Sequence, residues 1–476
     1  MYNINGLNEE CGVFGIINNK NALRIAYYGL HSLQHRGQEA AGITFKNGEY
    51  FETIKGRGLV ADVLTDEVIS CYSTRTAIGH VRYATAGGLG SANVQPFSFK
   101  FYDENLALAH NGHIGNAKDI KKELEEHGGV FSSTSDSELL IHLLRHEKGD
   151  FKTRLINSLN KLDGSFAYVL MHDDEMYGIR DKNGIRPLSI AKLDDYSYVL
   201  SSETCAYSVI GAKFVRDVLP GEVVKIKEGK IESYFYNDNC SQNLCLMEYV
   251  YFSRPDSTID NINVHFARKL CGKLLARQKP VEADIVIGVP DSSISAAIGY
   301  AEESGIPYEI GLIKNKYVGR TFIQPTPELR EKGVRMKLSA NEAIVKDKRI
   351  IMIDDSIVRG TTSKRIVQLL KEAGAKEVHV RIASPAIKYP CYYGVDISTY
   401  DELISSQLNV DELCKFIKAD SLSFLELDSL KKALNNVKYN DKNEHENRYC
   451  SACFNGDYVT KLYDALEVLN MNKQEL

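Results

Sequence analysis

The chain has 476 residues, enough for about two to four domains and a substantial core. Hydrophobic residues make up 43 % and charged residues 25 %, and 58 basic against 63 acidic side chains give a formal charge of -5. This balance excludes disordered and collagen-like chains. It also lacks the positive excess expected of a protein that binds nucleic acid, so we expect no nucleic-acid partner.

The sequence shows no signal for a membrane or for secretion. No apolar run approaches the ~18 residues that would span a bilayer, and no basic residue precedes a hydrophobic stretch at the N-terminus. We therefore expect a cytoplasmic protein without a membrane partner. Ten cysteines in so long a chain are too few for a disulfide framework, so we expect thiols, metal ligands or nucleophiles.

The first half of the chain, from Cys11 to about residue 235, is predicted to be rich in strands. Short β-branched and apolar runs alternate there with turn residues. Amphipathic helices are expected near Asn21–His35 and over Ser135–Arg145, the second opened by capping residues. The pattern indicates a layered domain of helices and sheets.

Cys11 opens an apolar segment that reads as a buried strand, where a lone cysteine is ordinarily a small core residue. Four further segments accompany it: Gln34–Gln38, Gly79–Thr85, His110–Gly112 and Ser135–Glu138. Together they resemble the glutamine amidotransferases of the N-terminal-nucleophile class, in which a short propeptide is cut off and cysteine becomes the first residue. The resemblance implies that residues 1–10 are a propeptide, removed autocatalytically.

That resemblance also assigns roles to the first site. The freed α-amino group, with a pKa near 7.7–8.0, can serve as the base that activates the Cys11 thiol. Arg82 would hold the α-carboxylate of glutamine and Asp136 its α-ammonium, while Asn111 and the backbone N–H of Gly112 would form an oxyanion hole. Taken singly, these residues read as a solvated arginine, a helix cap and an Asn-Gly turn. Their joint order favours function.

Beyond residue 258 the pattern changes to strands alternating with helices. A helix is predicted first, with one apolar face made of Phe266, Ala267, Leu270, Cys271 and Leu274. Strands over 284–290, 349–354 and 377–383 then alternate with helices over 293–303 and 361–373, and the tail from about 405 reads as helical. This order predicts a doubly wound parallel sheet, with ligands at the carboxyl ends of its strands.

The segment Ile351–Ser363 leaves a hydrophobic strand, crosses a tight turn and enters a helix whose N-terminus suits a phosphate. It resembles the diphosphoribose-binding loop of type I phosphoribosyltransferases, although a capped helix after a solvated Asp-Asp turn is the simpler alternative. The resemblance implies contacts with phosphoribosyl diphosphate from Asp354, Asp355, Ser356, Arg359, Gly360, Thr361, Thr362, Ser292 and Lys316. Magnesium would be held near Ser292, Asp354 and Asp355.

Two other segments would complete this second site. Val289–Ser292 resembles the pyrophosphate loop of the same family, but Ser293 stands where a glycine is expected. Only glycine adopts a positive φ freely, so the serine affects which backbone conformation is available here. The basic segment Lys314–Leu338 resembles the flexible loop that closes over diphosphoribose and excludes water. Its predicted anion contacts are Lys316, Arg320, Arg330, Arg335 and Lys337.

Four cysteines form a third candidate site. The pair Cys450 and Cys453 alone leaves zinc, an iron-sulfur cluster or no metal open. The segments at Cys245 and Cys391 resemble the iron-sulfur-containing branch of the amidophosphoribosyltransferases, which implies a 4Fe-4S cluster on Cys245, Cys391, Cys450 and Cys453. Spacing does not decide between a cluster and zinc. Cys240 is expected to lie outside the set, and Cys71, Cys205, Cys271 and Cys414 are expected to be packing residues.

Nearly the whole chain thus resembles the amidophosphoribosyltransferase family. The implied fold is an αββα N-terminal-nucleophile hydrolase domain over residues 11–235, then a type I phosphoribosyltransferase domain with a helical tail over 236–476. The implied reaction converts glutamine, phosphoribosyl diphosphate and water to phosphoribosylamine, glutamate and diphosphate, with ammonia passing between two sites. The resemblance further implies purine nucleotide inhibitors and a homotetramer. The alternatives are another glutamine amidotransferase, or a regulatory protein that senses a phosphoribosyl ligand.

Overall fold

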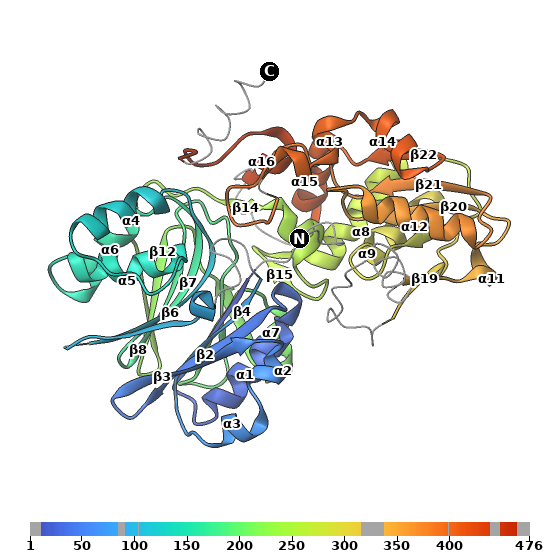
Figure 1. The fold of residues 1–476 in the computed structure, drawn as a ribbon. Helices are drawn as coiled ribbons and strands as arrows, with labels where there is room; N and C mark the ends of the chain where they lie inside the picture. Colours follow the sequence, from blue (N-terminus) through green and yellow to red (C-terminus); the bar gives the residue numbers. More distant parts are fainter. Residues whose placement is uncertain are drawn as a thin grey trace.

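The structure is a computed structural model that describes residues 11–83, 91–102, 104–315, 338–397, 399–437 and 448–463. The N-terminal domain, blue to green in Figure 1, lies beside a second domain coloured yellow to red. The N-terminal propeptide predicted over residues 1–10 and the basic-loop residues 316–337, including Lys316, fall outside the described ranges.

Two antiparallel sheets form the centre of the N-terminal domain. The first has the order β11 (Lys213–Asp217), β9 (Ser189–Lys192), β10 (Tyr198–Ser201), β1 (Gly12–Ile17), β4 (Ala77–Arg82), β2 (Ala40–Asn47) and β3 (Tyr50–Arg57). The second has the order β13 (Lys230–Phe235), β12 (Glu222–Lys227), β8 (Glu175–Arg180), β7 (Gly164–His172), β6 (Asn105–Ile114) and β5 (Phe97–Lys100).

Strand β1 shows why the sequence folds into layers. Successive side chains of a strand point to opposite faces, so Val13 and Ile17 join the core between the two sheets, whereas Phe14 and Ile16 join the core under helix α1 (Ala22–Ser32). The second sheet is covered on its outer face by α4 (Ala117–Glu126), α5 (Leu139–His146) and α6 (Phe151–Lys161). The predicted αββα arrangement is confirmed (Figure 1).

The second domain is built on a parallel sheet of the order β17 (Ile285–Gly288), β20 (Arg349–Asp354), β21 (Glu377–Ile382) and β22 (Ser421–Phe424). In β20, Ile351 and Ile353 pack toward α8 (Val264–Gln278) and α9 (Ile294–Ser304). Ile350 and Met352 face α12 (Thr361–Glu372) and α14 (Val410–Ile417). Helices on both faces of a parallel sheet confirm the doubly wound prediction.

Helix α8 corrects one sequence expectation. Ala267, Cys271 and Leu274 are buried, as predicted, but Phe266 is 59 % exposed. Successive residues of an α-helix are rotated by about 100° around its axis. The buried arc of α8 is centred on Ala267 and Cys271, so Phe266 lies beyond the edge of that arc. A period of 3.6 residues identifies the helix but not which flank of the apolar stripe meets the core.

The tail also differs from the prediction of a wholly helical segment. Alongside α13 (Ile404–Gln407), α14 and α15 (Leu427–Val437), the chain forms the strand β22, which extends the parallel sheet. It also forms β23 (Arg448–Cys450), which pairs in parallel with β14 (Asn243–Cys245), before the short helix α16 (Ala452–Asn455). Strands of three or four residues carry too little periodicity to be recognised from sequence.

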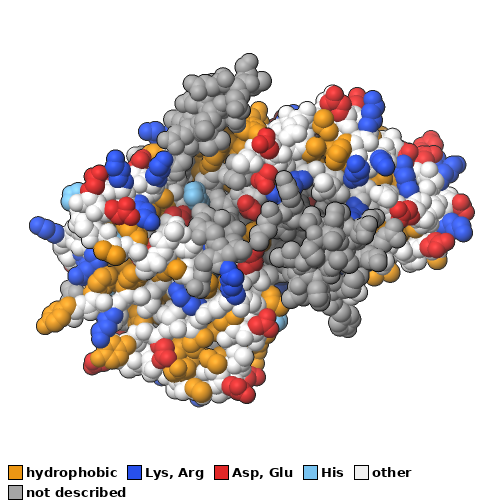
Figure 2. All heavy atoms as spheres, viewed as in Figure 1, with side chains coloured by type: hydrophobic (Ala, Val, Ile, Leu, Met, Phe, Trp, Pro, Cys, Tyr) orange, Lys and Arg blue, Asp and Glu red, His pale blue; other side chains and the backbone are white. Residues whose placement is uncertain are grey.

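The surface carries both signs of charge. On the face drawn in Figure 2, acidic and basic side chains are interspersed among polar ones. Within the described ranges, every helix is too short or too polar to cross a bilayer.

Candidate active sites

Strand pairing places the first candidate site at one end of the first sheet. Cys11 precedes β1 and is half-buried, and its Sγ lies 3.7 Å from the carbonyl oxygen of Tyr83. Gly12 pairs with Val81 in the antiparallel ladder, so continuing the register by one residue sets Cys11 opposite Arg82. Arg82 is itself buried at the end of β4. The structure therefore brings these two predicted residues together.

Asn111 and Gly112 lie in β6 of the second sheet, and a bond between the sheets holds that strand near β4. The ring Nε2 of His80 in β4 is 3.0 Å from the carbonyl oxygen of His110. The Asn111 side chain is buried, and its Nδ2 has no hydrogen-bond partner in the part of the chain that the structure describes. An unsatisfied buried donor is costly, so this amide is available to a ligand oxygen.

Gly112 is a glycine for a steric reason. Its φ is +144°, and a Cβ at this position would lie 2.1 Å from the carbonyl oxygen of Ser165 on β7. No other residue fits there without moving the neighbouring strand. The backbone of β6 at Gly112 is therefore determined by its packing against β7.

Asp136 begins a short 3₁₀ helix, Asp136–Glu138, which runs directly into α5, so the helix predicted over Ser135–Arg145 is present with a 3₁₀ first turn. The cap of this turn is Ser135, whose Oγ accepts from the N–H of Ser137. Asp136 Oδ2 instead accepts from the N–H of Ile114 at 2.8 Å and lies 3.4 Å from His113 Nδ1. This contact brings the carboxylate to the end of β6, two residues beyond Gly112.

Two buried histidines, His80 and His110, lie between these elements and were not expected from the sequence. Burial, reinforced by the charge of Arg82, lowers the pKa of His80 to about 3, and burial lowers the pKa of His110 to about 4. Both rings are therefore neutral at pH 7. His110 Nδ1 lies 2.8 Å from Ser137 Oγ, next to Asp136. Both histidines belong to quoted motifs, the only sequence signal that could have identified them.

Arg36 is a third residue of this site that the sequence did not identify. Its side chain is fully buried, and its Nε donates to the carbonyl oxygen of Cys11 at 3.0 Å. The same guanidinium binds two buried carboxylates, Glu203 at 2.6 Å and Glu248 at 2.8 and 2.9 Å. Glu248 lies in the π-helical turn Glu248–Phe252, beyond the last strand of the N-terminal domain.

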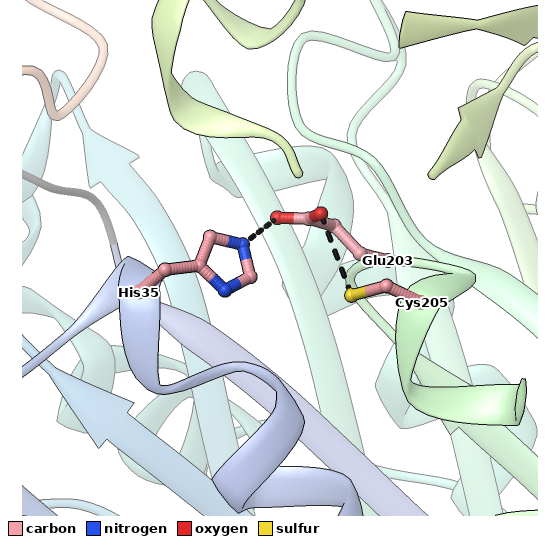
Figure 3. A group of neighbouring side chains, drawn as sticks. All are labelled: His35, Glu203 and Cys205. Carbon is pink, nitrogen blue, oxygen red and sulfur yellow. Dashed lines mark hydrogen bonds and ion pairs between the residues drawn. The ribbon is translucent and has the colours of Figure 1, made fainter. Parts of the chain in front are cut away.

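His35, Glu203 and Cys205 form a compact group (Figure 3), but its electrostatics do not favour a cation. His35 Nε2 lies 2.8 Å from Glu203 Oε1, and Cys205 Sγ lies 3.7 Å from Glu203 Oε2. Arg36 already binds Oε1, while Oε2 accepts from Ser257 and the N–H of Arg254. Burial, together with the charge of Glu203, raises the pKa of the Cys205 thiol, so the group is a buried hydrogen-bond network.

The second candidate site lies at the carboxyl ends of β17 and β20. Asp354 and Asp355 are buried, and they accept hydrogen bonds from the hydroxyls of Ser293 and Ser292 respectively. Burial, and for Asp354 also the neighbouring Asp355 carboxylate, raises the pKa of both carboxyls. A bound cation would reverse this effect by compensating the two charges.

The strand-to-helix turn has the predicted form. Gly360 caps α12 with a φ of +70°, and the helix begins at Thr361 with Thr362 in its first turn. Ser356 Oγ donates to Asp355 Oδ1 at 2.7 Å. Arg359 forms an ion pair with Glu402, a contact that the sequence did not predict.

The loop after β17 resolves the question of Ser293. Its φ is -88°, a conformation open to any residue, so the serine in place of glycine imposes no strain. Ser292 and Ser293 border a small pocket that is also lined by Asp355 and Arg268. Lys314, at the start of the basic segment, forms an ion pair of 2.8 Å with Asp291 of the same loop.

The four predicted cluster cysteines converge from three parts of the chain. Cys245 and Cys450 are register partners in the parallel pair of β14 and β23. The carbonyl oxygen of Cys453 accepts from the N–H groups of Lys388 and Tyr389, just before Cys391. The Cys391 thiol adds to the effect of burial in raising the pKa of Cys450 and Cys453, which places it close to both. None of the four is in a disulfide.

The remaining cysteines differ in how far they are buried. Cys205 and Cys271 are buried, as expected of packing residues, and Cys240 is half-buried with its thiol donating to the carbonyl oxygen of Asn237. Cys71 is exposed, which corrects the expectation that it packs in the core. It follows the short helix α3 (Asp66–Ser70), and its thiol donates to the carbonyl oxygen of Glu67.

A layered domain with a cysteine at the start of its first strand, joined to a doubly wound domain with two acids at a strand end, defines a glutamine amidotransferase fused to a phosphoribosyltransferase. Residues 80–208 match the family described as glutamine amidotransferase domain, and residues 260–411 match the phosphoribosyl transferase domain.

Several curated proteins are similar to this chain over nearly its full length. The chain is 55 % identical to the amidophosphoribosyltransferase of Bacillus subtilis (strain 168) over 463 residues, covering 97 % of this chain and 96 % of that protein. It is 50 % identical to that of Staphylococcus epidermidis over 466 residues, covering 98 % and 94 %.

Solved structures agree with this relationship. The B. subtilis glutamine phosphoribosylpyrophosphate amidotransferase complexed with ADP and GMP matches with a TM-score of 0.89 and 53 % identity, covering 95 % of this chain and 98 % of that one. A structure described as the allosteric regulatory enzyme of purine biosynthesis matches with a TM-score of 0.90 and 54 % identity, covering 95 % and 97 %.

The chain belongs to the amidophosphoribosyltransferase family. It is an enzyme of the first step of purine biosynthesis, which makes phosphoribosylamine, glutamate and diphosphate from glutamine, phosphoribosyl diphosphate and water. The alternative of a non-catalytic ligand sensor, or of another glutamine amidotransferase, is thereby set aside.

Proposed function

We propose that Cys11 is the nucleophile of a glutamine site in which Arg82 and Asp136 hold the substrate's α-carboxylate and α-ammonium. The observation that carries this proposal is the buried Asn111 amide, whose Nδ2 has no partner among the described residues and can donate to a developing oxyanion. The register that sets Cys11 opposite Arg82 supports it, as does the contact of Asp136 with the end of β6.

The chemistry follows from these placements. The Cys11 thiolate adds to the amide carbon, and Asn111 and the N–H of Gly112 hold the oxygen of the tetrahedral intermediate. The α-amino group of Cys11 takes the thiol proton and returns it to the departing nitrogen, which leaves as ammonia. Water then hydrolyses the thioester to glutamate. This sequence requires that residues 1–10 be removed, because a peptide nitrogen cannot act as the base.

The mature enzyme is therefore expected to begin at Cys11. Intact-mass analysis and N-terminal sequencing of active protein should find the chain shortened by residues 1–10. Cys11→Ala should keep these residues, because cleavage is proposed to be autocatalytic. Active enzyme that retains Met1 would contradict the assignment of the α-amino group as base.

For the second site we infer that Asp354 and Asp355, with Ser292, bind the ribose and a magnesium ion of phosphoribosyl diphosphate. The turn Ser356–Thr362 would receive the 5-phosphate at the N-terminus of α12. Carboxylate and hydroxyl oxygens are suitable ligands for Mg²⁺. The raised pKa of both buried acids shows that their negative charges are poorly compensated, which supports the binding of a cation here. When bound, the ion would neutralise the departing diphosphate. Arg359 and Lys316 are proposed as further anion contacts.

Asp355→Asn is expected to raise the KM for phosphoribosyl diphosphate by about tenfold or more, equivalent to at least about 1.4 kcal/mol. The substitution removes one negative charge that faces the ribose and the metal. Steady-state kinetics with ammonia as nitrogen donor would measure it, while glutamine hydrolysis should persist. Asp284→Asn is the matched control. Asp284 precedes β17 at the amino end of the same sheet's strands, away from the site, and pairs with Arg349. Unchanged saturation in Asp355→Asn would contradict the pocket assignment.

We also propose that Cys245, Cys391, Cys450 and Cys453 hold a 4Fe-4S cluster. The donor set fits, because four thiols meet in a largely apolar, buried region. Four thiolates suit either a 4Fe-4S cluster or zinc, and the resemblance of the segments at Cys245 and Cys391 to the iron-sulfur-containing branch favours the cluster. When present, the cluster would cross-link three chain segments.

Further features of the enzyme are proposed from the same placements. Ammonia passes from the first site to the second through the junction between the domains, which we set after Phe235, the last residue of β13. Purine nucleotides share ribose 5-phosphate with the substrate and would compete for the second site; the B. subtilis relative was solved with ADP and GMP. A homotetramer is proposed from the family resemblance.

A further inference from the structure

The segment that carries Cys391 packs directly against the strand of the proposed oxyanion hole. Ser165 Oγ on β7 donates to the carbonyl oxygen of Tyr393 at 2.7 Å. Ser165 is the register partner of His113, whose N–H donates to the same hydroxyl at 3.3 Å. Arg186 also donates to the Tyr393 carbonyl. Two side chains of the N-terminal domain thus bind one peptide group of the second domain.

Gly394 lies against Gly112 itself. Its φ is +103°, and a Cβ built on it would lie 3.2 Å from the carbonyl carbon and 3.3 Å from the carbonyl oxygen of Gly112. It would also lie 3.1 Å from Arg186 Nη2. Gly112 therefore packs closely against β7 at its Cα and against Gly394 at its carbonyl group.

The nucleophile is held in a similar way from the segment that follows Cys245. Glu248 binds the Arg36 guanidinium through both carboxylate oxygens, and Arg36 holds the carbonyl oxygen of Cys11. Glu248 comes three residues after Cys245, and Gly394 comes three residues after Cys391. Figure 1 shows β14, which ends at Cys245, and α16, which contains Cys453, where the two domains meet.

We propose that Glu248 and the Tyr393–Gly394 peptide are positioning residues of the glutamine site, fixed relative to each other by the four-cysteine group. Glu248 sets the position of Cys11 through Arg36, and Gly394 sets the position of Gly112. The inference rests on the proposed roles of Cys11 and Gly112. A displacement of about 1 Å between reacting groups can cost about 100-fold in rate, so close packing at both points bears on catalysis.

Gly394→Ala tests the proposal. We expect kcat for glutamine hydrolysis to fall about 10- to 100-fold, with the KM for glutamine within about twofold and ammonia-dependent synthesis unchanged. The added methyl group presses on the Gly112 carbonyl group and on Arg186 Nη2, which are its nearest neighbours. Gly456→Ala is the matched control: its φ is +76°, its Cβ would meet the Tyr389 ring at 3.0 Å, and it follows the helix of Cys453. It should leave glutamine hydrolysis unchanged.

A second measurement separates positioning from loss of structure. Glutamate γ-semialdehyde forms a tetrahedral adduct with a thiol and needs the oxyanion hole, whereas glutamate does not. In Gly394→Ala the inhibition constant of the aldehyde should rise by the factor lost in kcat, and that of glutamate should stay constant, with iron content equal to that of the parent enzyme. Ser165→Ala, which removes the bond to Tyr393 and the acceptor of the His113 N–H without adding bulk, should shift both quantities in the same direction.

Equal losses in both activities, or an unchanged affinity for the aldehyde in Gly394→Ala and Ser165→Ala, would overturn the proposal. Failure of the underlying site assignment has a different signature, because glutamine hydrolysis would then survive in Cys11→Ala. If Gly394→Ala does not fold, the Ser165→Ala results alone decide.

Discussion

Cys11→Ala is expected to abolish glutamine-dependent synthesis while synthesis from ammonia continues. The thiol is the only proposed nucleophile of the first site, and loss of a catalytic nucleophile costs about 10⁴-fold or more. The second site uses its own residues at the carboxyl ends of β17 and β20. Release of glutamate from glutamine and formation of phosphoribosylamine from an ammonium salt would be measured on the same preparation.

Cys71→Ala is the control for this substitution, because Cys71 is an exposed thiol of the same domain. It should keep both activities. If Cys11→Ala lost the ammonia-dependent activity as well, the division into two chemically independent sites would be refuted. Retained glutamine hydrolysis would assign the nucleophile elsewhere.

The strand, turn and helix that carry the second candidate site were predictable because their signals are local. Strand β20 was predicted at Arg349–Asp354 and has those bounds, and the helix after it begins at Thr361 as predicted. A buried run, a glycine with positive φ and a helix start follow one another within a short segment, so each element can be inferred from its neighbours. The serine at position 293, where the resemblance leads one to expect glycine, is accommodated because the backbone there is right-handed, with a φ of -88°.

The contacts around the first site could not be predicted, because they join residues far apart in sequence. Arg36 and Glu248 are separated by 212 positions, and Ser165 and Tyr393 by 228. Nothing in the local pattern of either segment identifies its partner. Buried charged groups are the exception among arginines and glutamates, so a sequence analysis assigns them to the surface by default. The pairing becomes apparent only when the two domains meet.

The same limit explains the errors over single residues. Cys71 and Phe266 were assigned to the core by residue type and period, yet both are exposed. Residue type indicates only a preference for the core or the surface. Which arc of a helix is buried depends on the element that packs against it. In α8 that neighbour is α9, which packs on the side of Gly272, where a Cβ would lie 1.9 Å from the carbonyl oxygen of Ala296.

The second large effect concerns the four cysteines. Removal of the proposed cluster, by exposure to air or by Cys450→Ser, is expected to abolish both activities and to accelerate proteolysis by about tenfold or more. Neither amide hydrolysis nor displacement at the ribose requires electron transfer, so the cluster would be structural. It would tie β14 and β23 to the Cys391 segment and close long loops. In the chain-entropy view, one cross-link across ~100 residues is worth about 4–5 kcal/mol.

Iron content, the visible absorption spectrum, activity and the rate of limited proteolysis would be followed together on anaerobically purified protein. Cys240→Ser is the matched control, because Cys240 lies five residues before Cys245 and its thiol already donates to the carbonyl oxygen of Asn237. It should retain iron and protease resistance. Zinc in place of iron, or activity and protease resistance that survive air unchanged, would contradict the cluster assignment. Neither result would affect Cys11 or Asp355, whose proposed roles depend on separate contacts.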